Sequence, residues 1–439
     1  MIHRIEEDIR TGMDDLRNTS FIREDRIPAY NLVINMLFLK TIVMDLNIGS
    51  SPETFEAAMH FNGNMNSKDY APLEDARTLQ KRAAAFYGKT ELETIPLGVD
   101  TRSINEAMKD KTVNALCNTL IALRDSDYDR FLDNLDFVLV RLSHTGRMHM
   151  NRDLMNLNPD LVNSISEMLE VRDEHTFADL TSGYGISTLY ILGKSNPKTV
   201  LRDNALDTLV LSEMLLIAAG KNISDTRVAD IFATDECEDL KADRIFIDPP
   251  FRTTSDADRF TTLDGIELKD AWVASIMKSA KALNNDGMAI IAVPAIVLHG
   301  VQNGLREVRE YLLDNHLLQA VISLPKCWRT SSIPTHLLVL SRRNNTKARF
   351  VNFIAGDDSD RISRFMDFRL LQNILTEEMN VSNEKYLKDV AYEDISADSF
   401  ISGIYISYSE SRNYRKDDIE RKLDELYAEL AEKIAKLRK

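Results

Sequence analysis

Short β-rich runs alternate with helical stretches between residues 177 and 341, and this alternation constrains the fold more than any other feature of the chain. Seven runs have the composition of strands: 177–180, 199–202, 227–229, 244–247, 288–293, 320–324 and 336–341. Helical patterns separate them at 186–193, 205–220, 270–283 and 302–315. Such alternation favours an α/β fold with a mostly parallel, doubly wound sheet of seven strands. In such sheets, ligands bind outside the carboxyl ends of the strands.

The two flanks of this segment are helical in pattern. Residues 30–45, 111–124 and 129–142 give apolar or amphipathic helical patterns, and few glycines interrupt them. Near the C-terminus, Ile and Leu side chains line one stripe from Ile419 to Leu437, with Glu and Lys around it. The predicted segments are an all-α N-terminal domain (1–145), a Rossmann-like α/β domain (146–345), a mixed extension (346–416) and an amphipathic C-terminal helix (417–439).

The composition predicts a globular protein with an ample core, since 44% of the 439 residues are hydrophobic and 28% are charged. No run of about 18 apolar residues occurs, so we expect no membrane span. The first residues lack a secretory pattern. Cys117, Cys237 and Cys327 are far apart and match no metal-binding spacing, which favours a reduced, cytoplasmic setting and no metal site.

A glycine-containing turn joins the first strand of the α/β segment to its first helix and reads Asp179-Leu-Thr-Ser-Gly-Tyr-Gly185. Gly183 and Gly185 let the backbone approach a ligand closely. Asp179 offers a carboxylate to a cationic amino-acid group, directly or through water. The GxxxxGK[ST] pattern of a P-loop is absent. The same residues also suit an ordinary strand-to-helix turn.

Two further acids follow the next two strands. Asp203 ends the second run, where a carboxylate can hold ribose hydroxyls. Asp230 follows the third run, where it can accept a hydrogen bond from an adenine amino group while Ile231 covers the ring. Each acid alone is typical of a solvated loop. Three acids after three successive strands favour a nucleoside cofactor with an amino-acid end.

The sharpest motif is Asp248-Pro-Pro-Phe251, directly after the strand at 244–247. Two prolines fix φ and cannot donate backbone hydrogen bonds, so the loop is stiff and its carbonyls are free. Acceptors at both hydrogens of an exocyclic amine would favour a pyramidal nitrogen whose lone pair points at a methyl donor. The Asp248 carboxylate and the Pro249 carbonyl are candidate acceptors, and Phe251 can stack on the base. The plainer interpretation is a Pro-Pro turn capped by Asp248.

These segments resemble the amino-methylating DNA methyltransferases, and more closely the modification subunit of type I restriction–modification systems. Residues 179–185 are similar to the motif D-P-x-x-G-[ST]-G, and residues 248–251 match [NDS]-P-P-[YFW]. The cofactor motif precedes the catalytic motif, as is usual for adenine-N6 enzymes of this group. Other similar segments are 37–40 in the helical region and 283–294, 320–325 and 335–340 in the later strands.

The resemblance implies transfer of a methyl group from S-adenosylmethionine to the N6 amino group of an adenine that is flipped out of double-stranded DNA. The implied catalytic residues are Asp248, Pro249, Pro250 and Phe251. The implied cofactor-binding residues are Pro159, Asp179, Thr181, Gly183, Gly185, Asp203, Asp230 and Ile231.

Three positions depart from the family pattern. Leu180 stands where the family usually has proline. The upstream F-x-T-P-like segment, which helps to hold the methionine end of the cofactor, is present only as Asn156-Leu-Asn-Pro159. Asp248 stands where type I members usually have asparagine, although a carboxylate is a competent acceptor.

The net charge of −15 is unfavourable for binding DNA without a partner, because contacts to the phosphates need Lys and Arg. The short stretch after Arg343 also leaves little room for a base-reading domain. We therefore expect a separate specificity subunit, and the resemblance implies a second copy of this chain and a restriction subunit as further partners. The helix at 417–439 is the expected docking element, although such a stripe equally suits a helix packed on its own domain. Candidate basic residues for the DNA face are Arg252, Arg259, Lys326 and Arg329, which equally suit a solvated surface.

Two alternatives stay open from the sequence. A similar Pro-Pro-aromatic loop occurs in methyltransferases that act on cytosine N4, on ribosomal RNA or on a protein glutamine. The altered segment 156–159 is also compatible with a catalytically degenerate assembly or DNA-binding subunit.

Overall fold

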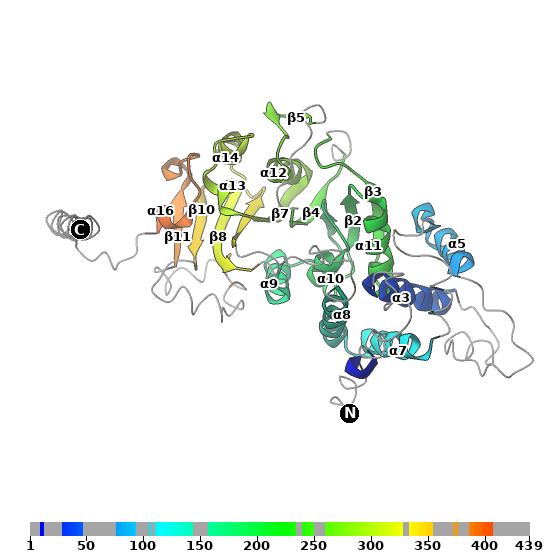
Figure 1. Ribbon diagram of the computed structural model, residues 1–439. Helices are drawn as coiled ribbons and strands as arrows, with labels where there is room; N and C mark the ends of the chain where they lie inside the picture. The colour runs from blue at the N-terminus through cyan, green and yellow to red at the C-terminus, as the bar shows by residue number, and fades with distance from the viewer. Residues whose placement is uncertain are drawn as a thin grey trace, which may run out of the picture.

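The computed structural model describes residues 9–12, 29–46, 76–93, 104, 107, 110–143, 157–233, 239–249, 260–327, 333–353, 371, 374–375 and 386–406. The strands of the main sheet are β1 (Thr176–Asp179), β2 (Lys198–Asp203), β3 (Ile223–Val228), β4 (Ala242–Ile247), β7 (Leu283–Val293), β8 (Leu318–Lys326), β9 (Pro334–Ser341), β10 (Lys347–Asn352) and β11 (Leu387–Ala391). They lie in the order β11-β10-β8-β9-β7-β4-β1-β2-β3 (Figure 1). A separate small hairpin pairs β5 (Thr262–Leu263) with β6 (Ile266–Glu267).

The helices of the N-terminal region are α3 (Ala29–Asp45), α5 (Ala76–Tyr87), the 3-10 turn η1 (Thr90–Glu93), α7 (Lys111–Ser126) and α8 (Tyr128–Ser143). Those that accompany the sheet are α9 (Pro159–Leu169), α10 (Ile186–Leu192), α11 (Leu206–Ala218), α12 (Ala271–Ala282), α13 (Ala295–His299), α14 (Leu305–Asp314), the 3-10 turn η4 (Tyr392–Asp394) and α16 (Ser402–Tyr405). The predicted helical front and the predicted alternation of strands and helices are both confirmed.

The sheet is mostly parallel in its central part. Strands β7, β4, β1, β2 and β3 run parallel to one another, whereas β9 is antiparallel to both β7 and β8. Consecutive parallel strands need a crossover connection, and α10, α11 and α12 provide such connections. This topology brings the carboxyl ends of β1 to β4 to one edge of the sheet.

Among the described residues, the sheet has nine strands rather than the predicted seven. The two additional strands come from the extension: β10 pairs in parallel with β8, and β11 pairs antiparallel with β10. An unpaired edge strand exposes a row of backbone hydrogen-bonding groups, and β10 covers this row on β8. Strand β3 also starts four residues earlier than predicted. Its first half contains mostly polar residues, so it lacks the hydrophobic pattern by which a strand is predicted.

Two hydrophobic clusters cover the two faces of the sheet. One cluster joins side chains of α12, α13 and α14 to Ile245, Ile291 and Val321. The other joins α9, α10 and α11 to the opposite face, and it continues without a break into α3, α7 and α8. The described N-terminal helices and the sheet therefore share one core, with α3 packed beside α11 (Figure 1).

Candidate active site

Four carboxylates follow four neighbouring parallel strands. Asp179 and Asp203 are the last residues of β1 and β2, Asp248 comes directly after β4, and Asp230 lies two residues beyond β3. The strand order β4-β1-β2-β3 places all four at the same edge of the sheet. This is the edge at which ligands bind in doubly wound folds.

Asp179 fixes the glycine-containing loop through two hydrogen bonds. Its Oδ1 accepts a hydrogen bond from the Thr181 amide at 3.0 Å, and its Oδ2 accepts one from the Thr188 hydroxyl at 2.6 Å. Burial raises the pKa of Asp179 to about 7, although both hydrogen bonds favour the charged form. The carboxylate is 3% exposed, so its first role is to fix the loop on α10.

Gly183 and Gly185 both adopt left-handed backbone conformations, with φ of +51° and +76°. Gly185 also precedes α10 and lies close to α11, because a Cβ built on it would stand 2.4 Å from Ser212 Oγ. Only a residue without a side chain satisfies both the conformation and the close approach. The loop therefore makes a tight turn at the carboxyl edge of the sheet.

The loop is tied to the end of β2 by two hydrogen bonds. The Ser182 amide donates to the Arg202 carbonyl, and the Gly183 amide donates to Asp203 Oδ2, both at 2.9 Å. Asp203 Oδ1 accepts a further bond from the Ala205 amide at 2.9 Å. Burial raises the pKa of Asp203. The side chain is partly exposed, so its remaining lone pairs can accept ribose hydroxyls.

Asp230 shapes the turn that follows β3. Its Oδ1 accepts from the Phe232 amide at 2.9 Å, and its carbonyl accepts from the buried Lys278 ammonium at 3.2 Å. Ile231 is partly buried against the cluster on the α12 face. The turn thus presents a carboxylate and an apolar side chain side by side, which suits the edge and face of an adenine ring.

Three buried hydroxyls around the loop fit a cofactor. Thr181 Oγ1, Ser182 Oγ and Ser212 Oγ have no hydrogen-bond partner among the described residues. Buried polar atoms are nearly always paired in folded proteins, so atoms of this kind need a ligand or water. Together with the backbone of Gly183 and Gly185, they fit the polar amino-acid end of S-adenosylmethionine.

The predicted catalytic loop starts directly after β4. Asp248 is partly exposed and Pro249 is buried, directly after β4. Strand β4 lies between β1 and β7, which places Asp248 next to the cofactor loop. Pro250 and Phe251 lie outside the described residues, as do Arg252, Arg259 and Arg329.

Pro159 is the first residue of α9. The Asn158 side chain caps this helix by accepting from the Asp160 amide at 2.8 Å, and the Asn158 amide donates to the Cys327 carbonyl at 2.8 Å. The start of α9 therefore lies beside the end of β8. Asn156 lies outside the described residues, and Leu180, which replaces the usual proline, is buried in the core.

Sequence reasoning missed several residues of this edge. Thr188 and Ser212 lie on helices, and nothing in the sequence distinguishes them from other helix residues. In the folded chain, Thr188 contacts Asp179 and Ser212 lies against Gly185. Leu206 and Val228 are 41% and 44% exposed next to Asp203 and Asp230. Exposed apolar side chains near the predicted nucleoside contacts can signal a binding surface, but their exposure is known only from the structure.

A family model decides which family the chain belongs to. The model described as N-6 DNA Methylase matches residues 195–415, which is half of the chain. The chain belongs to this family. S-adenosylmethionine is therefore its methyl donor, and the N6 amino group of adenine in DNA is the acceptor of the methyl group. A search of curated protein sequences finds no match.

Solved structures show the same fold at low sequence identity. A chain from a structure of type I restriction–modification complex assembly superposes with a TM-score of 0.62 at 15% identity, over 99% of this chain and 97% of that one. The methyltransferase subunit of a type I system from Streptococcus thermophilus superposes with a TM-score of 0.57 at 16% identity, over 89% and 96%. The fold is thus that of S-adenosylmethionine-dependent methyltransferases.

Two further features of the described residues bear on the site. They contain no cluster of three or more His, Cys, Asp or Glu side chains arranged to hold a metal ion. Within the same part of the chain, no helix is long and apolar enough to cross a membrane.

Proposed function

We propose that this chain is the modification subunit of a type I restriction–modification system, in which another chain selects the adenine that it methylates. The observation that carries the proposal is the set of four carboxylates at the ends of β4, β1, β2 and β3, with Asp248-Pro249 next to the glycine-containing loop. The family membership and the fold of the two type I structures support it.

The cofactor residues divide into a loop and two acids. When bound, S-adenosylmethionine supplies an electrophilic methyl group. Thr181, Gly183 and Gly185 would hold its amino-acid end, with Asp179 fixing the loop beneath and Pro159 closing the far side. Asp203 would accept hydrogen bonds from the ribose, while Asp230 and Ile231 would bind the adenine edge and face.

The catalytic loop would act on the target amine. The Asp248 carboxylate and the Pro249 carbonyl would each accept one hydrogen of the N6 amine. This would pull the nitrogen towards a pyramidal geometry and free its lone pair for attack on the methyl group. Phe251 would stack on the flipped base, with Pro250 keeping the loop stiff. After transfer, Asp248 is the acceptor for the proton that leaves nitrogen.

Methylation of duplex DNA by the wild type and by Asp248→Ala, each assembled with a specificity subunit, tests this role. We expect Asp248→Ala to abolish N6-methyladenine, measured by mass spectrometry of the digested DNA, while calorimetry still detects S-adenosylmethionine binding. Asp314→Ala is the matched control, because this exposed acid lies at the end of α14 away from the site. Unchanged methylation by Asp248→Ala, or methylcytosine as the sole product of the wild type, would refute the assignment.

The partner proposal rests on charge. A net charge of −15 supports a separate specificity subunit that contributes DNA contacts, alongside a second copy of this chain and a restriction subunit. We propose residues 417–439, which lie outside the described residues, as the docking segment. Deleting them should weaken association with a specificity subunit in co-purification and leave cofactor affinity unchanged; normal assembly would exclude the docking role.

A further inference from the structure

Glu213 is an unusual residue on α11, because its side chain is fully buried and it carries a carboxylate. Its Oε1 accepts from Lys89 Nζ at 2.7 Å and from Thr226 Oγ1 at 2.5 Å. Its Oε2 has no hydrogen-bond partner among the described residues. Burial raises the pKa of Glu213, and Lys89 and Thr226 act against that shift. A buried carboxylate of this kind depends on its cation.

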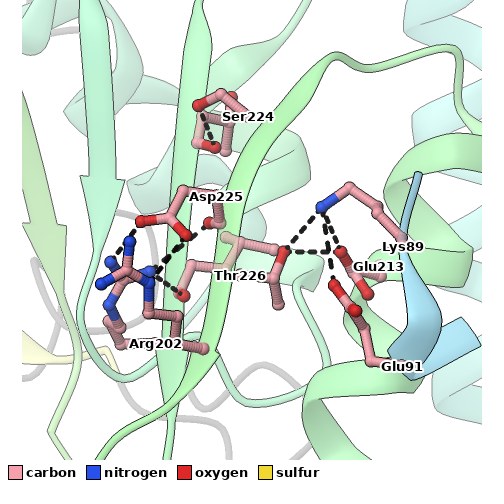
Figure 2. A network of polar contacts seen from close by, with 10 residues as sticks. Lys89, Glu91, Arg202, Glu213, Ser224, Asp225 and Thr226 are labelled. Atoms are coloured by element: carbon pink, nitrogen blue, oxygen red, sulfur yellow. Dashed lines mark hydrogen bonds and ion pairs between the residues drawn. The ribbon is translucent and has the colours of Figure 1, made fainter. Parts of the chain in front are cut away.

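The cation comes from the N-terminal region. Lys89 lies between α5 and η1, and its ammonium also lies 3.3 Å from Thr226 Oγ1 and 3.8 Å from Glu91. Gly88, with φ of +68°, ends α5 in a left-handed turn, and the Lys89 amide then donates to the Ala84 carbonyl. The turn aims Lys89 at the flank formed by α11 and β3 (Figure 2).

Two routes lead from this ion pair to the cofactor edge. The first runs along α11, where Ser212, the neighbour of Glu213, sets the space available to Gly185. The second runs along β3. Thr226 lies on this strand, four residues before Asp230, which is in the turn that follows.

A second ion pair lies on the opposite face of the sheet, because successive side chains of β3 alternate between the two faces. Asp225, next to Thr226, accepts from Arg202 Nη2 at 2.5 Å (Figure 2). Arg202 directly precedes Asp203 in the sequence. The Arg202 carbonyl also accepts from the Ser182 amide of the cofactor loop. This second pair thus connects β3 to the end of β2 and to the loop, and only the backbone of β3 joins it to Thr226.

We propose that Lys89 is a positioning residue for the cofactor site: by neutralising Glu213 it holds α11 and β3 at the spacing that the loop and Asp230 require. Without Lys89, the buried carboxylate would draw water towards α11, and the helix would shift relative to Gly185. The N-terminal helices would thus set cofactor affinity without contacting the cofactor. The inference rests on the proposed function only through its cofactor.

Titration calorimetry of the full chain with S-adenosylmethionine, well below the melting temperature of each variant, tests the inference. We expect Lys89→Met to weaken binding about three- to thirtyfold, the range usual for coupling through packed side chains. Lys89→Met/Glu213→Gln should recover most of the affinity, since no charge is then left buried. In methylation assays, KM for S-adenosylmethionine should rise in Lys89→Met while kcat at saturating cofactor is unchanged.

Lys194→Met is the matched control. Lys194 also joins the N-terminal helices to the methyltransferase part, through Asp129 on α8 at 2.6 Å, but this pair is exposed (67% and 71%). Its loss should leave cofactor affinity unchanged. Thr226→Val serves as a milder variant should Lys89→Met fail to fold, and it should weaken binding in the same direction.

Three results would overturn the inference: a lower melting temperature in Lys89→Met with unchanged cofactor affinity, a double variant as weak as the single one, or an equal loss in Lys194→Met. If Lys89→Met does not fold, unchanged affinity in Thr226→Val overturns it. Wild-type protein that is assembled with a specificity subunit and binds the cofactor but leaves adenine unmethylated would refute the proposed function, while the response to Lys89→Met would still decide this inference.

Discussion

Gly185 shows how one residue links the local backbone to the packing of the site. Its φ of +76° favours glycine, and its closeness to Ser212 leaves no room for a Cβ. Gly220 has the same φ with open space around it. Alanine substitutions at the two glycines therefore distinguish the free-energy cost of the left-handed conformation, which both share, from the cost of a steric clash, which only Gly185 has.

Replacing Gly185 with alanine should reduce both stability and cofactor affinity. The left-handed conformation costs an alanine about 1–2 kcal/mol, and the collision with Ser212 adds to it. Gly220→Ala should show the conformational cost alone and leave cofactor affinity intact. Chemical denaturation and calorimetry measure the two effects. Equal losses in both variants would mean that Ser212 does not constrain the loop.

Asp179 should make stability depend on pH. Its folded pKa of about 7 lies above the ordinary value of 3.8, so the folded state binds the proton more tightly. The stability contribution of this group is complete below its unfolded pKa and is lost as the pH rises through about 7. Relative to wild type, Asp179→Asn should therefore gain stability as the pH rises across this window, measured by urea unfolding. A constant difference between the two proteins would contradict this.

At the scale of elements, α9 connects the start of the methyltransferase part to the end of β8. Asn158 caps the helix with its side chain and binds Cys327 with its amide. The segment that departs most from the family pattern is thus built into the fold at this point. Its structural role explains why Pro159 and Asn158 suit this position even without the aromatic and threonine of the family motif.

Asn158→Ala should destabilise the protein by about 1 kcal/mol, because the first turn of α9 loses its cap. Asn158→Asp should retain most of the stability, since a carboxylate caps equally well. Thermal unfolding measures both variants. An alanine variant as stable as the wild type would show that water or a neighbouring residue replaces the cap.

At the scale of the whole molecule, the helical front and the methyltransferase sheet form one hydrophobic core. The side chains of α3 are buried along most of the helix, and α3 packs on α11 rather than forming a separate bundle. The same cluster reaches Phe177 and Phe246 on the sheet. The two parts should consequently unfold together.

Calorimetry should show a single unfolding transition with equal calorimetric and van't Hoff enthalpies. Phe38→Ala truncates a fully buried side chain on α3. It should lower the free energy of unfolding by about 3–5 kcal/mol and shift the single transition to a lower temperature. Phe86→Ala is the control, because this side chain on α5 is 54% exposed. Two separate transitions, with only one sensitive to Phe38, would show independent domains.

The sequence by itself determined the strand-helix alternation, the glycine-containing loop, and the acids after β1, β2, β3 and β4. These features are local, since they depend on residues adjacent in the chain. The tertiary structure decided which side chains meet. The burial of Asp179 with Thr188, the contact between Gly185 and Ser212, and the pairing of Lys89 with Glu213 join residues from different elements. Hydrophobic periodicity predicts elements and their buried faces, but not the partners of a buried polar group, which depend on how separate elements pack.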